Sequence, residues 1–183
     1  MINSHELLYI VDENNQPLEP QVRSLAHKNG LWHRTTGIWV INDKGQVLCQ
    51  QRSLKKDIKP GFWEAFFGGH LAPDEDYLHN AVQESNEELG ITINKDMLIP
   101  YKVLKSDKPT HKEFQSIYAL IMNKDVTEFQ FEKEEIDQLK WIEVAEVKRI
   151  LSDKTVENWV KKPWDQEVLT WLPSLPNRIS NSK

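Results

Sequence analysis

The sequence predicts a domain of the α/β or α+β class, in which helices pack on at least one long sheet. Two runs of strand composition, "TGIWVIN" (36–42) and "FQSIYALIM" (114–122), indicate the sheet. The segment 77–89 has the apolar period of an amphipathic helix. A chain of 183 residues is also long enough to bury a core between such layers.

Strand-like segments recur along most of the chain. The turn "DKG" after residue 42 predicts that the strands on either side of it form a hairpin. We expect residues 20–33 to form a loop or short helix, and "KKDIKPG" (55–61) to form a basic loop. In chain order, strands are expected at 7–11, 36–42, 46–52, 62–70, 98–104, 114–122 and 138–142.

The segment 77–89 is the best-defined helix. The preceding "APDED" supplies acidic residues that suit a first turn, and Gly90 suits the C-terminal end. The stripe expected to face the core consists of Leu78, Val82, Ser85 and Leu89.

The last third of the chain predicts a C-terminal helical segment over 143–173. "VAEVKRIL" (144–151) has helical composition, and 155–173 is expected to be helical on both sides of Pro163, which should break or kink it. We expect residues 1–173 to form a single domain and 174–183 a disordered tail. The tryptophans of this segment, Trp159, Trp164 and Trp171, are expected to pack in the core or in a lid.

Charge and cysteine content restrict the function classes. A net charge of −5 argues against general nucleic-acid binding, although it allows a local basic pocket for a phosphorylated small molecule. The single cysteine, Cys49, excludes an internal disulfide and fits a reducing cytosol. Without a signal peptide or an apolar run of membrane length, the expected location is the cytoplasm, with no membrane partner.

The stretch "QESNEELG" (83–90) gathers three carboxylates on one helical face. Glu84, Glu87 and Glu88 stand at positions i, i+3 and i+4, so they repel one another. No lysine between Leu78 and Leu89 relieves that repulsion. Either salt screens an ordinary acidic face, or a hard divalent cation, which prefers carboxylate oxygens, binds there.

The wider spacing around these acids resembles the box of the Nudix hydrolases, G-x5-E-x7-R-E-U-x-E-E-x-G-U, where U is apolar. At about 7% abundance per residue type, such a match has chance odds on the order of 10⁻⁵. The resemblance implies a Nudix α/β/α sandwich with a mixed sheet and a loop–helix–loop catalytic box over 69–91. The matching positions are Gly69, Glu75, Glu84, Glu87, Glu88 and Gly90.

The same resemblance implies Mg²⁺- or Mn²⁺-dependent hydrolysis of a diphosphate linkage in a nucleoside diphosphate derivative or another small organic diphosphate. It makes Glu87 and Glu88 the main metal ligands, Glu84 a ligand or base, and the Gly69 carbonyl a further ligand. Glu75 would have a supporting role. A later loop glutamate serves some relatives as the base, and Glu134 or Glu135 could take that place, with Glu135 as our candidate.

Two box positions depart from the family pattern. Ser85 replaces an apolar residue, which softens packing. Gln83 replaces an arginine that orients the box carboxylates, and glutamine offers hydrogen bonds without charge or a rigid fork. Lowered activity is therefore one expectation. A further hypothesis is a binding or regulatory module that keeps the fold without activity.

A second resemblance is to type I isopentenyl-diphosphate isomerase, an enzyme of the same fold, so we place the chain in the related branch of the Nudix superfamily. Gly68 stands where that family has its catalytic cysteine, and glycine cannot move a proton, so the isomerase remains the alternative. His27, His33, His70 and Glu113 fall near its metal ligands, with His111 where a second glutamate is expected. The predicted substrate-binding residues are Arg23, Arg52, Lys56 and His70.

Several points stay open at this stage. The basic loop places cations beside the acidic helix, where Arg52 and Lys56 would offset phosphate charge. We expect Lys59 to be an ordinary solvated residue. The organic group of the substrate, a second metal site at the histidines and a homodimer are left undecided.

Overall fold

The computed structural model describes residues 6–109 and 111–175. Within them, a mixed sheet of order β5-β4-β3-β7-β6 carries β8 on β4, and a separate pair joins β1 to β2. The strands are β1 (Leu7–Leu8), β2 (Gln21–Val22), β3 (His33–Ile41), β4 (Gln46–Arg52), β5 (Trp63–Glu64), β6 (Leu98–Lys108), β7 (His111–Ile121) and β8 (Ile136–Glu143). The helices are α1 (Arg23–Lys28), α2 (Tyr77–Leu89), α3 (Val144–Ser152) and α4 (Asp165–Trp171), with 3₁₀ turns η1 (Lys95–Met97), η2 (Val126–Glu128) and η3 (Leu172–Ser174).

The centre of the sheet is the parallel pair β3–β7, in register from His33 opposite Glu113 to Ile41 opposite Ile121. Helices cover both faces of this pair, so both strands are almost wholly buried. All other pairings within the sheet are antiparallel. The mixed sheet predicted from the sequence is therefore confirmed.

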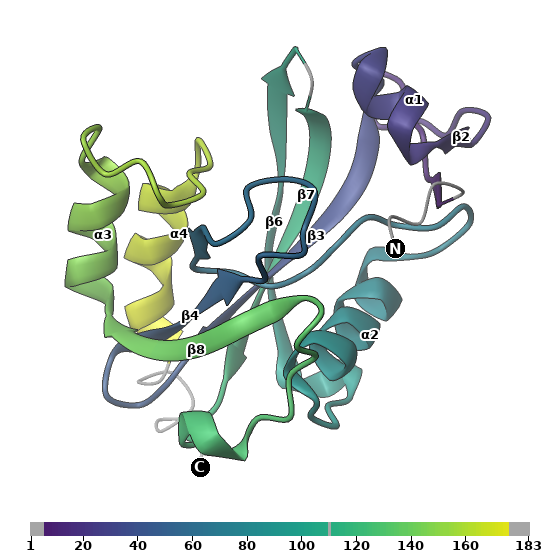
Figure 1. Cartoon of the computed structure of the whole chain (residues 1–183). Helices are drawn as coiled ribbons and strands as arrows, with labels where there is room; N and C mark the ends of the chain where they lie inside the picture. Colours follow the sequence, from purple (N-terminus) through teal and green to yellow (C-terminus); the bar gives the residue numbers. More distant parts are fainter. Residues whose placement is uncertain (1–5, 110, 176–183) are drawn as a thin grey trace.

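The side chains of β3 alternate between two cores. Trp39 and Ile41 pack with α3 and α4 on one face, whereas Ile38 and Val40 pack with α2 on the other. Figure 1 shows α2 on one side of the sheet and the α3–α4 pair on the other. This confirms the three-layer α/β/α arrangement, with α2 on one face of the sheet and α3 and α4 on the other.

Helix α2 has the predicted bounds, and the predicted stripe faces the core. The Asp76 carboxylate accepts a hydrogen bond from the His79 amide at 2.9 Å, and Gly90 ends the helix at φ 59°. Leu78 and Val82 are half-buried and pack against the core cluster on this face. The buried residues are Asn80, Ala81, Ser85 and Leu89.

Three predicted elements were wrong in extent. The strand expected over 7–11 is reduced to β1, followed by single bridges at Ile10 and Val11. The strand expected over 62–70 is reduced to β5, since Gly68 at φ 124° interrupts it and leaves only single bridges at Phe67 and His70. The segment before Pro163 is not helical. Its backbone is extended at 158–160, where it pairs with Trp63. The Trp63 amide donates to the Asn158 carbonyl at 2.9 Å, and the Val160 amide donates to the Trp63 carbonyl at 2.9 Å.

The C-terminal part of the described chain completes the α3–α4 core. Trp159 and Trp164 are buried there, and Trp171 stacks on Tyr101 with ring centroids 4.4 Å apart. Of the tail expected over 174–183, Ser174 ends η3 and Leu175 packs into the core, while 176–183 lie outside the described residues. The described helices include none that is long and apolar enough to cross a membrane.

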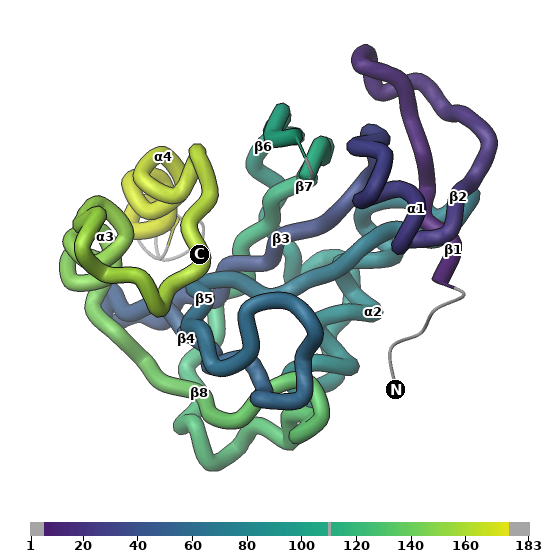
Figure 2. Tube along the Cα trace, turned by 45° about the horizontal axis from the view of Figure 1, so that its top comes forward, coloured from purple at the N-terminus to yellow at the C-terminus, as the bar shows by residue number. Residues whose placement is uncertain are grey.

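The loop between β4 and β5 lies against the chain that leads into β8, as Figure 2 shows. The Ser53 amide donates to the Glu135 carbonyl at 2.9 Å, which joins the two segments. This contact brings the basic loop predicted at 55–61 beside the acidic stretch at 132–135.

Gly90 fixes the end of α2, and we expect Gly90→Ala to lower the free energy of unfolding by about 3 kcal/mol. The new methyl group would overlap the Gln130 carbonyl, and alanine is strained at positive φ. Gly45→Ala is the matched control, because Gly45 has φ 77° but no atom within 4 Å of an added Cβ. Its cost should be about 1 kcal/mol in urea unfolding. Equal costs for the two variants would contradict a close contact at Gly90.

Candidate functional site

A cavity of about 740 Å³ opens between α1, α2, the tip of the β6–β7 hairpin and the loop after β4. Its floor includes Thr35 and Thr36 of β3 and Gln115 of β7. Acidic and basic side chains both line its wall, and a volume of this size suits one small phosphorylated molecule.

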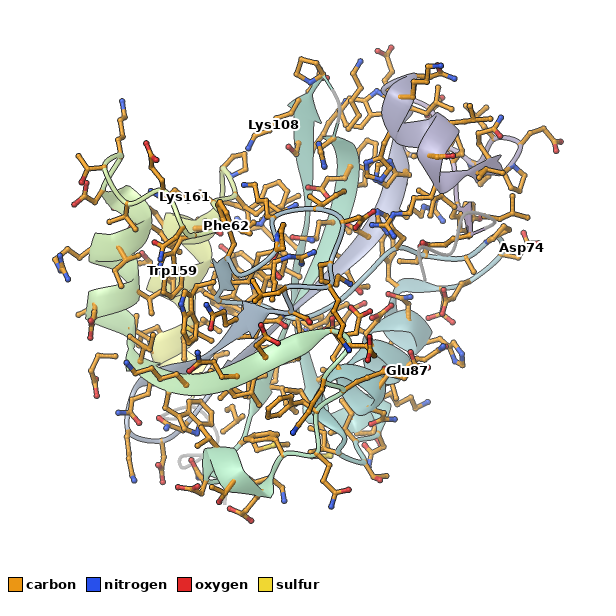
Figure 3. All side chains as sticks on the ribbon, viewed as in Figure 1. Phe62, Asp74, Glu87, Lys108, Trp159 and Lys161 are labelled. Carbon is orange, nitrogen blue, oxygen red and sulfur yellow. The ribbon has the colours of Figure 1, made fainter. Side chains whose placement is uncertain are left out.

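Helix α2 projects Glu84 and Glu88 into this cavity against the glycine pair 68–69. The Gly68 amide donates to Glu88 Oε2 at 2.8 Å. Gly69 lies so close to Glu84 that any Cβ there would overlap the Glu84 carboxylate. Glu87, labelled in Figure 3, stands on the exposed side of the same helix at the cavity wall. The three acids predicted as ligands are thus brought together, with the backbone of Gly69 beside them.

Burial and mutual repulsion raise the pKa of both inner carboxyl groups. For Glu84 the main cause is burial, followed by the charges of Glu87 and Glu75, and its pKa reaches about 7. Burial and then the Glu84 charge raise the pKa of Glu88, against the Gly68 hydrogen bond. Two buried carboxylates without a counter-cation are unfavourable, so this donor set fits a divalent cation bound between them.

Glu75 and Asn80 hold the loop that enters α2. Glu75 Oε2 accepts hydrogen bonds from the Ala72 amide at 2.9 Å and from Asn80 Nδ2 at 3.1 Å. Asn80 also donates to the His70 carbonyl and accepts from the Thr36 hydroxyl. Asn80 was not predicted from the sequence. The signal that could have identified it is its position one helical turn before Glu84.

Gln83 already orients one of the acids. Its Nε2 donates to Glu87 Oε1 at 3.0 Å, one helical turn ahead. The position that carries arginine in the family box therefore keeps a hydrogen bond to a box carboxylate, without the charge.

The predicted substrate-binding cations converge on the cavity, each beside a carboxylate. Arg23 pairs with Glu6 at 3.1 Å, and Arg52 pairs with Glu64 at 3.0 Å. Lys56 pairs with Glu135, which places the candidate base at the cavity wall. Neither Glu6 nor Glu64 was predicted, because nothing in their local sequence indicates a partner.

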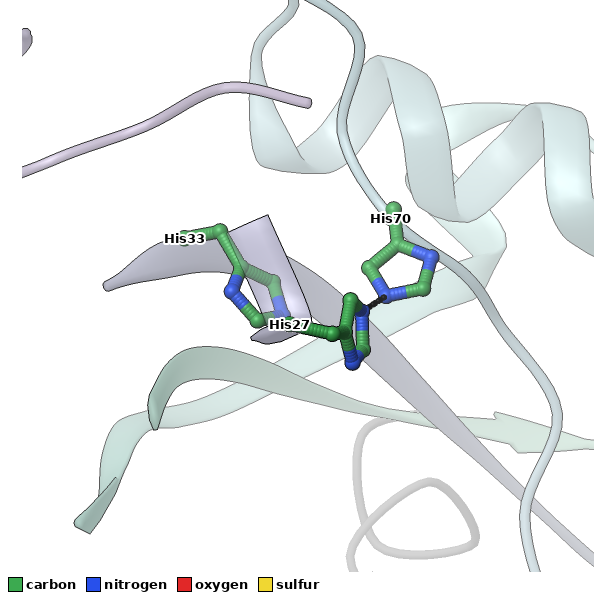
Figure 4. Close-up of side chains that lie close together, drawn as sticks. All are labelled: His27, His33 and His70. Atoms are coloured by element: carbon green, nitrogen blue, oxygen red, sulfur yellow. Dashed lines mark hydrogen bonds between the residues drawn. The ribbon is translucent and has the colours of Figure 1, made fainter. Parts of the chain in front are cut away.

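The histidines form a compact cluster at the α1 side of the cavity (Figure 4). His27 Nε2 and His70 Nε2 lie 3.3 Å apart, and one ligand atom from each of His27, His33 and His70 falls within 4.8 Å of the others. His33 Nδ1 donates to the Leu31 carbonyl at 2.9 Å, which leaves Nε2 free to bind. Glu6 Oε1 lies 3.4 Å from His70 Nδ1.

Electrostatics keep part of this cluster neutral. Burial, then the charges of His70 and the neighbouring histidines, lower the pKa of His27 to about 3. The same two causes lower the pKa of His33 to about 4. Neutral imidazole is the form that binds metals, so His27, His33 and His70 could hold a metal ion, separate from the acids of α2.

Gly68 cannot be replaced by a cysteine without a backbone change. At φ 124°, an added Cβ would lie 2.5 Å from the Thr36 carbonyl oxygen. The single cysteine of the chain, Cys49, is fully buried among the residues that pack with α3 and α4, and burial raises its thiol pKa. No described cysteine therefore reaches the cavity.

Comparisons with known proteins agree with this geometry. A family model described as NUDIX domain matches residues 31–171. Isopentenyl-diphosphate Delta-isomerase 1 of Photorhabdus laumondii is 29% identical, over 87% of this chain and 93% of that protein. An uncharacterized Nudix hydrolase of Pseudomonas aeruginosa, PA4841, is also 29% identical, over 75% of this chain and 78% of that protein.

Solved structures share the fold. The crystal structure of DR0079 from Deinococcus radiodurans has a TM-score of 0.71 at 21% identity, over 91% of this chain and 98% of that one. The NUDIX domain of NrtR from Shewanella oneidensis, complexed with ADP ribose, has a TM-score of 0.56 at 14% identity, over 77% and 86% of the two chains.

Removal of the Gln83 amide should loosen Glu87. We expect Gln83→Ala to raise the apparent dissociation constant for Mn²⁺ roughly twofold to fivefold, because one hydrogen bond to a carboxylate is lost. Gln83→Arg should bind Mn²⁺ at least as tightly as the wild type, since arginine adds a charge-assisted bond. Calorimetric titration measures both, and Gln166→Ala on α4 is the control. Unchanged binding in Gln83→Ala would contradict an orienting role.

Proposed function

The chain belongs to the NUDIX domain family, and we propose that it hydrolyses a diphosphate linkage with the help of Mg²⁺ or Mn²⁺. The substrate would be a nucleoside diphosphate derivative or another small organic diphosphate. The observation that carries this proposal is the pair of buried carboxylates, Glu84 and Glu88, pressed against Gly68–Gly69 at the wall of a cavity that also holds Arg52 and Lys56.

The acids of α2 would hold the cations. Glu84, Glu87 and Glu88 supply carboxylate oxygens, and the Gly69 carbonyl adds a neutral one, a donor set that suits hard divalent ions. When bound, such ions activate water and polarise the phosphoryl oxygens. The chain's own contribution is to fix these oxygens: Gly68 anchors Glu88, and Gln83 anchors Glu87.

The cations of the cavity wall would bind the diphosphate. Lys56 and Arg52 can turn from their carboxylate partners to phosphate oxygens, and Arg23 and His70 border the same cavity. When a phosphate takes Lys56, the Glu135 carboxylate loses its partner and can accept the proton of the attacking water. Glu135 is accordingly our candidate for the general base.

The relatives that are named isomerases favour a second candidate, an isomerase-like reaction at the histidine cluster. The cluster of His27, His33 and His70 is retained, which supports metal binding there. Gly68 opposes the reaction, because it supplies no acid or base and its backbone leaves no room for a side chain.

Glu88→Gln is the direct test of the hydrolase proposal. We expect a loss of about two orders of magnitude or more in metal-dependent release of phosphate or monophosphate from a panel of nucleotide, sugar and isoprenoid diphosphates. Glutamine can still accept the Gly68 hydrogen bond and it removes repulsion with Glu84, so the melting temperature should be unchanged or higher. Glu157→Gln, on an exposed loop, is the control. A wild-type rate in Glu88→Gln at limiting Mg²⁺ would refute the assignment.

We expect no conversion of isopentenyl diphosphate to the dimethylallyl isomer. Purified protein with Mg²⁺, Mn²⁺ or Zn²⁺ should leave the NMR spectrum of the substrate unchanged, because position 68 lacks a proton-transferring group. Gly68→Cys should also be inactive, and destabilised, because its Cβ meets the Thr36 carbonyl. Metal-dependent appearance of dimethylallyl diphosphate with the wild type would establish the isomerase alternative.

A further inference from the structure

Most cations that line the cavity already have a partner. Lys161 is a special case, because its ammonium donates to the carbonyls of Asp153 and Val156 and so holds the loop before α4. Five further cations of the cavity wall are paired with carboxylates: Arg23–Glu6, Arg52–Glu64, Lys55–Glu134, Lys56–Glu135 and Lys162–Glu113.

Lys59 and Lys108 differ from this pattern. Both line the cavity, and in the described part of the chain neither has a carboxylate within ion-pair distance nor an acceptor for its ammonium. Lys59 belongs to the loop after β4, and Lys108 ends β6 at the tip of the hairpin, where Figure 3 labels it. Both ammonium groups therefore line the same cavity without a paired carboxylate among the described residues.

The mutual influence of the two lysines supports their proximity. Burial lowers the pKa of Lys59, and the charge of Lys108 is the next largest cause, followed by the opposing charge of Glu64, which raises the pKa, and then by the charges of Lys162 and Arg52. Lys59 was expected to be a solvated residue; its side chain is exposed, and it also lines the cavity.

The loop holds Lys59 in a defined conformation. Its backbone has φ 50°, a left-handed value that is uncommon outside glycine and that persists only where the surroundings enforce it. Arg52 Nε donates to the Ile58 carbonyl at 3.1 Å, and the Phe62 amide donates to the Lys59 carbonyl at 3.3 Å. The Lys59 ammonium lies 5.4 Å from the centre of the Phe62 ring.

We propose that Lys59 and Lys108 form a second anion-binding subsite, so that the preferred substrate is an organic diphosphate whose organic group carries a further phosphate or carboxylate. The inference rests on the proposed function for the diphosphate itself, which the acids of α2 and the paired cations would bind. A cavity of about 740 Å³ has room for an organic group beyond the diphosphate. In a chain of net charge −5, two lysines without ion-pair partners on a cavity wall would attract an anionic group of the substrate.

Matched substrate pairs test the subsite. ADP-ribose and its 2′-phosphate differ by one phosphate, and UDP-glucose and UDP-glucuronate differ by one carboxylate. Calorimetric binding is measured with Mg²⁺ and with methylene-bridged analogues of these compounds, in which a P–C bond replaces the hydrolysable P–O bond, and kcat/KM is measured separately with the unmodified compounds and Mg²⁺. The variant is Lys59→Ala/Lys108→Ala, two exposed substitutions, and the control is Lys140→Ala/Lys154→Ala, which removes the same charge outside the cavity.

We expect the wild type to bind the more anionic member of at least one pair about tenfold more tightly, as two charge-assisted contacts would provide. In the Lys59/Lys108 variant this preference should fall below about twofold, with the less anionic member changed by less than about threefold. The pair that shows the effect identifies phosphate or carboxylate as the group.

Three outcomes overturn the subsite: no preference in the wild type for either pair, equal weakening of both members in the variant, or the same loss in the control. Equal weakening would place the lysines on the diphosphate, and a loss in the control would mean a general charge effect. Absence of hydrolysis with every compound would refute the proposed function alone, because the binding preference among the non-hydrolysable analogues does not depend on turnover.

Discussion

The contact of α2 with Gly68–Gly69 is the constraint on which the rest of the site depends. Glu88 accepts the Gly68 amide, and Gly69 gives Glu84 the space that any side chain would fill. Two half-buried carboxyl groups are thereby held close together, and burial and the neighbouring acidic charges raise the pKa of Glu84. Such an arrangement is retained at functional sites because a ligand relieves it, and a divalent cation is the ligand that carboxylate pairs favour.

The same glycine pair separates this chain from its isomerase relatives. The histidine cluster and the cavity cations remain, so the wall on the α1 side keeps the character expected from that resemblance. At Gly68 the left-handed backbone, with Thr36 directly against it, is compatible only with glycine. Position 68 therefore offers no proton-transferring side chain, and its backbone leaves no room for one.

The sequence predicts what depends on local spacing. The bounds of α2, the β3–β4 hairpin and the grouping of Glu84, Glu87 and Glu88 follow from helical period, turn residues and the box pattern. It does not predict what depends on partners distant in the chain. The extended run at 158–160 forms because Trp63 pairs with it, and Glu6 and Glu64 become ion-pair partners only after folding. Ion pairing also decides which lysines are neutralised, so the isolation of Lys59 and Lys108 could not be inferred from a basic loop alone.

The first part of the chain completes the cavity, although it precedes the region matched by the family model. Glu6, Arg23 and His27 all reach the wall from β1 and α1 or beside them. Backbone hydrogen bonds fix this segment: Tyr9 donates to the Leu71 carbonyl, and Arg34 of β3 donates back to Tyr9. Because Leu71 directly follows Gly69–His70, the segment is attached to the loop that contacts the acids of α2. Backbone contacts therefore join the first part of the chain to this loop and to β3, which places the histidine cluster and the acids of α2 on the wall of one cavity.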